Sequence, residues 1–305
     1  MEQNYKVRTV LGDVSSNELG VILPHEHICC YSEYLYQMAG DKYLNKELLY
    51  ITSAKYLKEL KEKYGVHTFI DCTPVNIGRD VELLKNVSKR SGVNIVCSTG
   101  FYYTEESLLS NKDIDFITDF LVTDANAVRA GIIKCAVENK TISAYDEKLL
   151  RASARAQLRL EIPIILHTNA NNQNGLKALE ILLSEGIKTE AVTIAHMSDT
   201  DDLKYIQQIA HYGCFIGFDR LYSILTKEYI TKTVAKINML CNLGYEDKIL
   251  LSHDALFFNG FDKVPIINGK PRFSYCFEHI LSQLPRDIVE KIMKRNPIKM
   301  LRCGN

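Results

Sequence analysis

The chain has 305 residues, 46% of them hydrophobic and 24% charged, and its 37 basic residues balance 37 acidic ones. This composition supplies a large core, and the zero net charge argues against nucleic acid or an acidic membrane surface as a partner. No apolar run approaches the roughly 18 residues of a membrane span, the start lacks an apolar signal segment, and nine cysteines without C-x-x-C spacing fit a reduced compartment. We therefore expect a cytoplasmic protein that acts on a small molecule.

Short β-branched runs alternate with longer amphipathic segments along the chain. Eight runs are predicted strands, centred on Val21–Leu23, Val66–Ile70, Val93–Cys97, Gly131–Ile133, Ile164–Leu166, Val192–Ile194, Cys214–Gly217 and Ile249–Leu251. The predicted helices between them include Glu47–Tyr64, Val81–Arg90, Tyr145–Leu160, Gly175–Ser184 and Thr200–His211.

Near-continuous apolar strands separated by helices predict a parallel sheet buried on both faces. Eight strands favour one α/β domain over residues 1–305, folded as a (β/α)8 TIM barrel. The structural rival is a doubly wound open sheet, but no G-x-G-x-x-G follows the first strand.

Two histidines, His25 and His27, lie one residue apart at the end of the first predicted strand. Alternate side chains of a strand share a face, so both can point at one ion while Glu26 points away. Four later strands also end in potential ligands, namely Lys134, His167, His196 and Asp254. A barrel places the C-terminal ends of all its strands at one mouth, where active sites are assembled.

Six such residues exceed what one tetrahedral metal requires, whereas two ions sharing a bridge would use them all. A protonated lysine cannot be a ligand, so Lys134 must be neutral or modified; carboxylation by carbon dioxide would turn it into a bidentate oxygen ligand. The plainer interpretation is a set of core histidines, one core lysine and an aspartate that caps a helix.

Taken in order, the motifs resemble those of the phosphotriesterase-like members of the amidohydrolase superfamily. They are His25-Glu26-His27, Gly100-Phe101-Tyr102, Gly131-Ile132-Ile133-Lys134, His167-Thr168-Asn169-Ala170, Gly186, His196–Asp201, Ile216–Arg220, Ser252-His253-Asp254 and Asn296-Pro297. The resemblance implies a barrel with a binuclear metal centre at its C-terminal mouth, and relatives are often dimers, so it also points to a homodimer.

By the same resemblance, the more buried ion would be held by His25, His27 and Asp254. His167 and His196 would hold the more exposed ion, and a carboxylated Lys134 would bridge the two. The ions would be divalent, with Zn²⁺ expected first and Mn²⁺, Co²⁺ or Fe²⁺ as alternatives. Asp254 would orient the attacking hydroxide and then take its proton, as ligand and general base together.

Further residues near the strand ends have two readings each. Lactone-hydrolysing relatives carry a tyrosine at the position of Tyr102, which would otherwise be a packing residue. Arg220 either holds a substrate oxygen or pairs with Asp219 or another acid. Asp71 either supports a ligating histidine or caps a helix. Alternation aims His253 away from the mouth, so we expect it to pack or to support the site.

The segment Ala255–Pro271 is predicted to be the longest loop at the mouth, where barrels set their specificity. Beyond it, Arg272 and Tyr275 would share a helical face beside a helix N-terminus if Pro271 opens a helix. That arrangement suits an anion and is similar to the phosphate grip of phosphorylated-sugar lactonases in this family. A surface ion pair with a packed aromatic is the alternative.

The leading functional hypothesis is a metal-dependent lactonase acting on a phosphorylated sugar lactone, which Lys263, Lys270 and Arg272 favour. The alternative is an N-acyl-homoserine lactonase with incidental phosphotriesterase activity, favoured by the apolar stretch Ala255–Phe258 that could cover an acyl chain. Amide hydrolysis fits the same centre. A non-catalytic metal-binding barrel is a different class, against which the intact ligand set and Asp254 argue.

Overall fold

The computed structural model describes residues 4–221 and 226–302 of the chain. Its central feature is a sheet of eight parallel strands in the order β11-β10-β9-β8-β7-β6-β5-β3. The strands are β3 (Val21–Glu26), β5 (Val66–Asp71), β6 (Asn94–Gly100), β7 (Ile132–Ala136), β8 (Ile164–His167), β9 (Val192–Ile194), β10 (Phe215–Phe218) and β11 (Ile249–Leu251). All eight predicted strands are confirmed.

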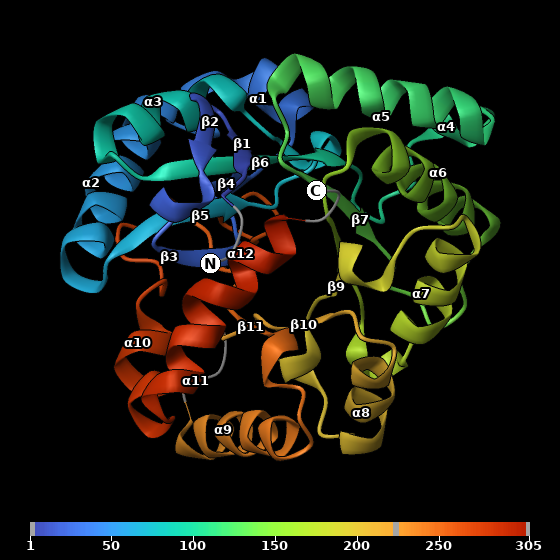
Figure 1. Ribbon diagram of the computed structural model, residues 1–305. Coiled ribbons are helices and arrows are strands. Elements are labelled where there is room, and N and C mark those ends of the chain that lie inside the picture. Colours follow the sequence, from blue (N-terminus) through green and yellow to red (C-terminus); the bar gives the residue numbers. More distant parts are fainter. Residues whose placement is uncertain (1–3, 222–225, 303–305) are drawn as a thin grey trace.

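The sheet curls so that β11 returns to β3, with the helices around the ring (Figure 1). The amide of Asp254, just past β11, donates to the carbonyl of His25 in β3 (3.1 Å). The amide of His27 donates in turn to the carbonyl of Ala255 (3.0 Å). These bonds join the two edges at one end of the nearly closed barrel, and the predicted α/β TIM-barrel class is confirmed.

The predicted helices are present with small shifts at their ends. They are α2 (Lys46–Tyr64), α3 (Val81–Ser91), α6 (Ala144–Leu160), α7 (Gly175–Ser184) and α8 (Leu203–His211). Ser143 begins α6 with a capping box to Asp146. Helix α8 begins three residues later than predicted, because the Asp202 side chain accepts from the amides of Lys204 and Tyr205 as its N-cap.

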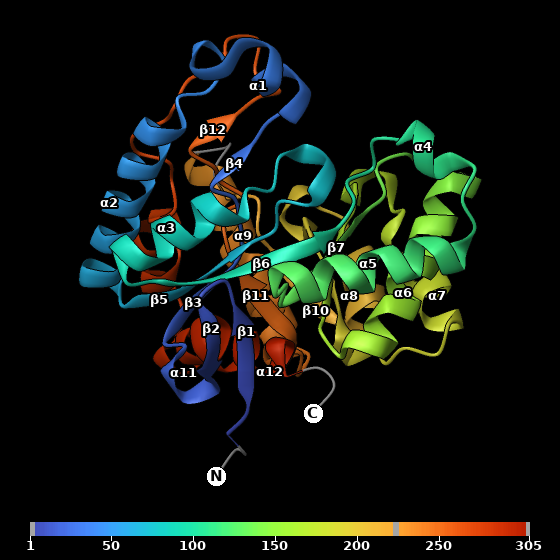
Figure 2. The same cartoon turned by 90° about the horizontal axis from the view of Figure 1, so that it is seen from above.

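Other elements were not predicted. They are the helices α1 (Glu33–Ala39), α4 (Ser107–Ser110), α5 (Ile114–Val128), α9 (Lys227–Asn242), α10 (Tyr275–His279), α11 (Arg286–Glu290) and α12 (Asn296–Leu301), and the strands β1 (Lys6–Thr9), β2 (Gly12–Ser15), β4 (Cys29–Cys30) and β12 (Phe258–Asn259). Strands β1 and β2 form an antiparallel hairpin. Figure 2 shows this hairpin and α12 at the end of the barrel opposite β4 and β12.

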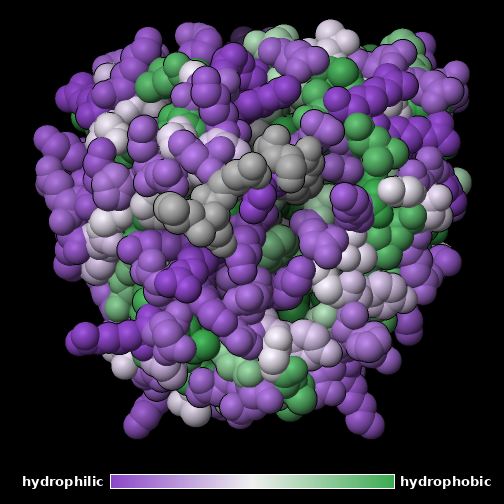
Figure 3. Space-filling model, in the orientation of Figure 1, coloured by the Kyte–Doolittle hydropathy of each residue, from purple (hydrophilic) through white to green (hydrophobic). Residues whose placement is uncertain are grey.

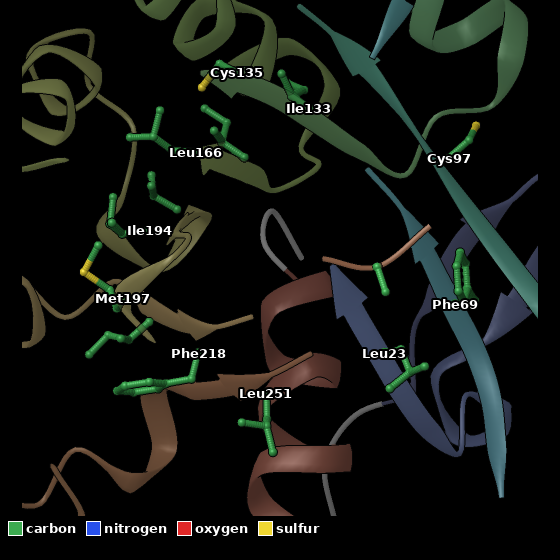
Figure 4. Close-up of a cluster of buried hydrophobic side chains, with 14 of the residues drawn as sticks. Leu23, Phe69, Cys97, Ile133, Cys135, Leu166, Ile194, Met197, Phe218 and Leu251 are labelled. Atoms are coloured by element: carbon green, nitrogen blue, oxygen red, sulfur yellow. The ribbon is translucent and has the colours of Figure 1, made fainter. Parts of the chain in front are cut away.

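Alternation along the strands divides the core into two clusters. One cluster lies between the strands and the helices, and every strand of the ring contributes to it (Figure 4). The second cluster fills the barrel axis with Ile22, Ile70, Val96, Ile132, Ile165, Ala195 and Leu250. Lys134 and His167 each follow an axial residue by two positions, Ile132 and Ile165, so alternation aims them toward the axis as well.

The cysteines of the described ranges are free thiols, and all of them except Cys241 are buried. Within those ranges, no helix combines the length and the apolar character needed to cross a membrane.

Candidate metal centre

The structure brings the six predicted ligands together at the end of the barrel where the strands finish. Nζ of Lys134 lies 2.7 Å from Nε2 of His25. A carboxylate oxygen of Asp254 lies 3.5 Å from the same nitrogen and 3.1 Å from Nε2 of His27. The second pair closes the cluster, since Nε2 of His196 lies 2.8 Å from Nδ1 of His167 and 4.0 Å from Asp254.

One buried carboxylate, Asp219, orients two of the rings. It follows β10, and its two oxygens accept from Nδ1 of His25 (2.6 Å) and Nδ1 of His196 (2.9 Å). The backbone amide of His196 donates to it too (2.7 Å). With the proton held on Nδ1, each ring presents the lone pair of Nε2 to the centre of the cluster. This is the usual arrangement of a histidine that ligates a metal.

Thr73 does the same for His27. The Thr73 hydroxyl donates to the carbonyl of Cys29 (3.2 Å), so its oxygen accepts from Nδ1 of His27 (2.9 Å). Nε2 of His27 is therefore left free to face Asp254. Thr73 is itself placed by Asp71, whose side chain accepts from the amides of Thr73 and Ile28. Asp71 thus supports a histidine through Thr73, and the alternative that it caps a helix is wrong.

In His167 the two ring nitrogens exchange roles: Nε2 carries the proton, and Nδ1 faces the cluster. Its Nε2–H donates to Glu138 beyond β7 (3.1 Å), and the second oxygen of Glu138 accepts from Asn169 (2.8 Å). Nδ1 of His167 is then an acceptor that faces the acceptor Nε2 of His196. Two lone pairs at 2.8 Å repel each other unless a proton or a cation lies between them. This nitrogen pair, with the nearby carboxylate, fits a divalent cation of the kind that imidazole and carboxylate bind.

The pKa shifts of the four histidines agree with the binding of a divalent cation. Burial lowers the pKa of His167 to about 4 and also lowers the pKa values of His25 and His196. These three rings are therefore neutral, and each has a lone pair to donate to a metal ion. For His27, burial lowers the pKa, but Cys30 and Asp254 outweigh it and raise the pKa to about 10. A cation bound by His27 and Asp254 would therefore displace a proton.

Two of the clustered residues have strained backbones. His196 has φ +69° and Asp254 has φ +54°, in the left-handed region that side chains other than glycine rarely adopt. Such conformations persist where the surroundings enforce them, and they concentrate at functional sites.

Gly100 lies next to Lys134 in the sheet, where no side chain fits. A Cβ at this position would lie 1.9 Å from the Lys134 carbonyl oxygen, so only glycine lets the two strands approach here.

Arg220 pairs with acids, as one of its two interpretations expected, and the partners are Asp254 and Asp199, whereas Asp219 is not among them. Its guanidinium donates to Asp254 (3.2 Å) and to Asp199 (2.7 Å), while Asp219 is taken up by the histidines. These contacts place a positive charge against the carboxylate oxygen of Asp254 that does not face His27. Arg220 also lines the cavity at the mouth.

Glu26 and His253 form a buried pair behind the cluster. Glu26 points away from the histidines, as predicted, and accepts from Nδ1 of His253 (2.6 Å), the hydroxyl of Ser252 and the amides of His253 and Ala255. His253 accepts from the amide of Cys276 (3.1 Å). The pair therefore fixes the backbone on both sides of Asp254, which is the supporting role expected of His253. His67, His211 and His279 lie outside the cluster.

A cavity of about 130 Å³ opens above the cluster. It is lined by His27, Cys30, Ile77, Tyr102, Lys134, His167, Arg220, Asp254, Leu256, Asn259 and Phe261. The Tyr102 ring lies 5.1 Å from the His167 ring, and its hydroxyl makes no hydrogen bond with the described residues. The hydroxyl is thus available to a substrate.

The predicted helix start at Pro271 is wrong. The chain turns inward because Phe273 is fully buried against Phe69 and Phe257, and the helix begins only at Tyr275. Tyr275 is 5% exposed, with its ring 4.5 Å from that of His279, while Arg272 is exposed. Neither residue is among those that line the cavity.

The orienting roles of Asp219, Thr73 and Glu138 were not predicted from the sequence. Asp219 directly follows a strand, and the strand-end rule that singled out Asp254 could have found it. Thr73 and Glu138 lie two residues beyond their strands, in irregular loops with no periodic signal.

Comparisons with known proteins agree with this geometry. A model described as the phosphotriesterase family matches residues 5–301. The chain is 33% identical to an aryldialkylphosphatase of Saccharolobus solfataricus, over 94% of this chain and 96% of that protein. It is also 29% identical to a phosphotriesterase homology protein of Mycobacterium tuberculosis (90% and 88% covered) and 27% identical to an N-acetyltaurine hydrolase of Bos taurus (95% and 92% covered).

Proposed function

The chain belongs to the phosphotriesterase family, and from that premise we propose that it is a lactonase that opens a lactone ring with two divalent metal ions. The coarser description, a metal-dependent hydrolase of this family, rests on the family match and the named hydrolase relatives. Those relatives argue against a barrel that binds metal without turnover. The lactone substrate and the metal pair are our proposal.

In the proposed assignment, His25, His27 and Asp254 would hold one divalent ion, and His167 and His196 would hold the other. A carboxylated Lys134 would supply oxygen ligands shared by both. Bound divalent ions would supply Lewis acidity to the scissile group and lower the pKa of a water molecule between them. Zn²⁺ suits this imidazole and carboxylate set, as do Mn²⁺, Co²⁺ and Fe²⁺.

The remaining steps fall to residues of the chain. Asp254 accepts the proton of the attacking water, because its carboxylate reaches into the histidine cluster. Arg220 holds that carboxylate in place through its bond to the second oxygen. Tyr102 offers its hydroxyl to the substrate oxygen next to His167.

The lining of the mouth cavity supports the choice of substrate. Ile77, Leu256 and Phe261 make one wall apolar, and the guanidinium of Arg220 is already engaged by two acids. Apart from Lys134, which the proposal assigns to the metal centre, the described lining offers a phosphate no cation that lacks a carboxylate partner, whereas an acyl chain would find apolar contacts. The geometry favours an N-acyl-homoserine lactone, with incidental hydrolysis of phosphotriesters at the same centre.

A phosphorylated sugar lactone is the second candidate. Lys263, Lys270 and Arg272 are exposed on the segment that follows the apolar wall, and they could meet a phosphate outside the cavity. N-acetyltaurine, an amide, is the substrate that the names of other relatives suggest.

One substrate panel tests the proposal. Purified protein is loaded with Zn²⁺, Mn²⁺ or Co²⁺, and proton release is followed on acyl-homoserine lactones, phosphorylated lactones, a phosphotriester and N-acetyltaurine. We expect the highest kcat/KM on acyl-homoserine lactones, about two ions per chain by elemental analysis, and loss of turnover after chelation. Turnover of N-acetyltaurine alone would refute the lactonase, and full turnover without metal would refute the metal centre.

A further inference from the structure

A second cavity lies at the other end of the barrel. It has a volume of about 320 Å³, within the range of small-molecule sites. Its walls come from the segments flanking the β1–β2 hairpin and from the C-terminal helices: Tyr5, Ser16, Asn17, Gly20, Glu290, Lys294, Arg295, Ile298, Lys299 and Arg302. Figure 2 shows these elements opposite β4 and β12, so the cavity is separate from the metal centre.

Basic side chains predominate in the lining of this cavity. Four basic side chains and one acidic one line it, although the whole chain is neutral. Lys294 pairs with Glu290 (3.1 Å), and Lys299 pairs with Asp247 (3.2 Å). The guanidiniums of Arg295 and Arg302 form no ion pair with any residue in the described ranges. Figure 3, which views this end of the molecule, shows mainly hydrophilic residues on the face.

Helix geometry gathers the four cations on one side. The π-helix η9 (Lys291–Arg295) runs directly into α12. Lys294, Arg295, Lys299 and Arg302 then recur at spacings of one, three and four residues around the same wall. A π-helix is rare and is often found at functional sites.

The opposite wall is polar and firmly placed. Tyr5 donates its hydroxyl to the carbonyl of Ile298, which ties the N-terminal segment to α12. Ser16 and Asn17 come from the turn after β2 and add side chains that can bond to an oxygen-rich ligand. The end of α12 is anchored in turn, since Met300 and Leu301 pack into the axial core.

We propose that this cavity binds a small anion that carries a phosphate group, at a site independent of the hydrolytic centre. Arg295 and Arg302 would clamp the phosphate, because planar guanidiniums bind phosphate oxygens in pairs. Ser16 and Asn17 would contact the uncharged part. The volume suits a molecule of the size of a sugar phosphate.

Glucose 6-phosphate is the probe, with glucose as the matched ligand that lacks the phosphate. Binding to metal-loaded protein is measured by calorimetry at constant ionic strength, because salt screens exposed charges. We expect saturable binding of the phosphate ester only, and a loss of about tenfold or more in affinity in the double variant Arg295→Ala/Arg302→Ala. The control variant Arg286→Ala removes an exposed arginine on α11 outside the cavity and should bind normally.

Three outcomes would overturn the site: no saturable binding of glucose 6-phosphate, full affinity in the double variant, or an equal loss in Arg286→Ala. Binding at the metal centre belongs to the second outcome, because it would survive in the double variant. Circular dichroism and hydrolase activity show whether each variant is folded. Arg302→Gln, which keeps the length of the side chain closer to native, replaces the double variant if that protein does not fold.

Discussion

Lys134 is buried with its Nζ 2.7 Å from Nε2 of His25, and it forms no ion pair with a carboxylate of the described residues. A second buried lysine of the described ranges, Lys236, has different neighbours: its Nζ donates to the carbonyls of Ser198 and Thr200 and lies 3.1 Å from Asp201. Buried ammonium groups are normally paired in this second way. The first arrangement favours a lysine that is uncharged or chemically modified.

We therefore predict that Lys134→Ala loses bridged metal and activity together. Elemental analysis should show fewer than two ions per chain, and short carboxylic acids added to the assay should restore part of the turnover by taking the place of the bridge. The control is Lys236→Ala, which should lower stability because it removes an ion pair but should keep the metal. Full metal content and activity in Lys134→Ala without added acid would show that this residue is no bridge.

Asp254→Asn should reduce kcat by about 10² or more, because the amide cannot accept the proton. Since Asp254 also lies among the histidines, metal content has to be measured alongside the rate. Asp199→Asn is the matched control, as Asp199 shares Arg220 with Asp254 but lies outside the histidine cluster. Normal turnover at normal metal content in Asp254→Asn would exclude it as the general base.

Asp219→Asn should weaken metal binding about 10- to 100-fold, the usual effect of losing a carboxylate that orients ligating histidines. An asparagine side chain offers one acceptor oxygen and a donating NH₂ group, so it cannot accept from both His25 and His196. Competition with a chelator measures the affinity. Asp124→Asn, which breaks the pair with Arg79 at a distance from the centre, should leave it unchanged. Equal affinities in the two variants would mean that Asp219 has no orienting role.

The strands and the clustered ligands were predictable because both depend on local patterns. A buried parallel strand is a short apolar run, and its last residues must lie at the mouth, so His25, Lys134 and Asp254 could be placed together without coordinates. Helix α5 was missed because its sequence contains several β-branched residues, and its packing face is only apparent from the burial of Ile117, Leu121 and Ala125.

What could not be predicted depends on contacts between distant segments. Thr73 reaches His27 across 46 residues, and Glu138 reaches His167 from an irregular loop. The turn before Tyr275 also depends on a contact between distant segments. A helix beginning at Pro271 agrees with local preference, but burial of Phe273 against Phe69 overrides it, and Arg272 and Tyr275 are not among the residues that line the cavity.

Phe261 and Arg272 distinguish the two candidate substrates. Phe261 is 65% exposed and lines the mouth cavity, so an acyl chain could cover it. Each buried methylene is worth about 0.8 kcal/mol, and Phe261→Ala should therefore lower kcat/KM about tenfold for a long-chain acyl-homoserine lactone. A short-chain lactone should barely change, and Arg272→Ala should affect neither substrate, because Arg272 lies outside the cavity.

A phosphorylated sugar lactone gives the opposite pattern. If this is the substrate, Arg272→Ala should lower kcat/KM by about 1.5 to 3 kcal/mol, the scale of a charge-assisted hydrogen bond, while Phe261→Ala has little effect. Steady-state kinetics of both variants on the long-chain, short-chain and phosphorylated substrates separate the two candidates. Equal losses on long and short acyl chains in Phe261→Ala would make Phe261 a structural residue, and the apolar wall would then no longer support an acyl substrate.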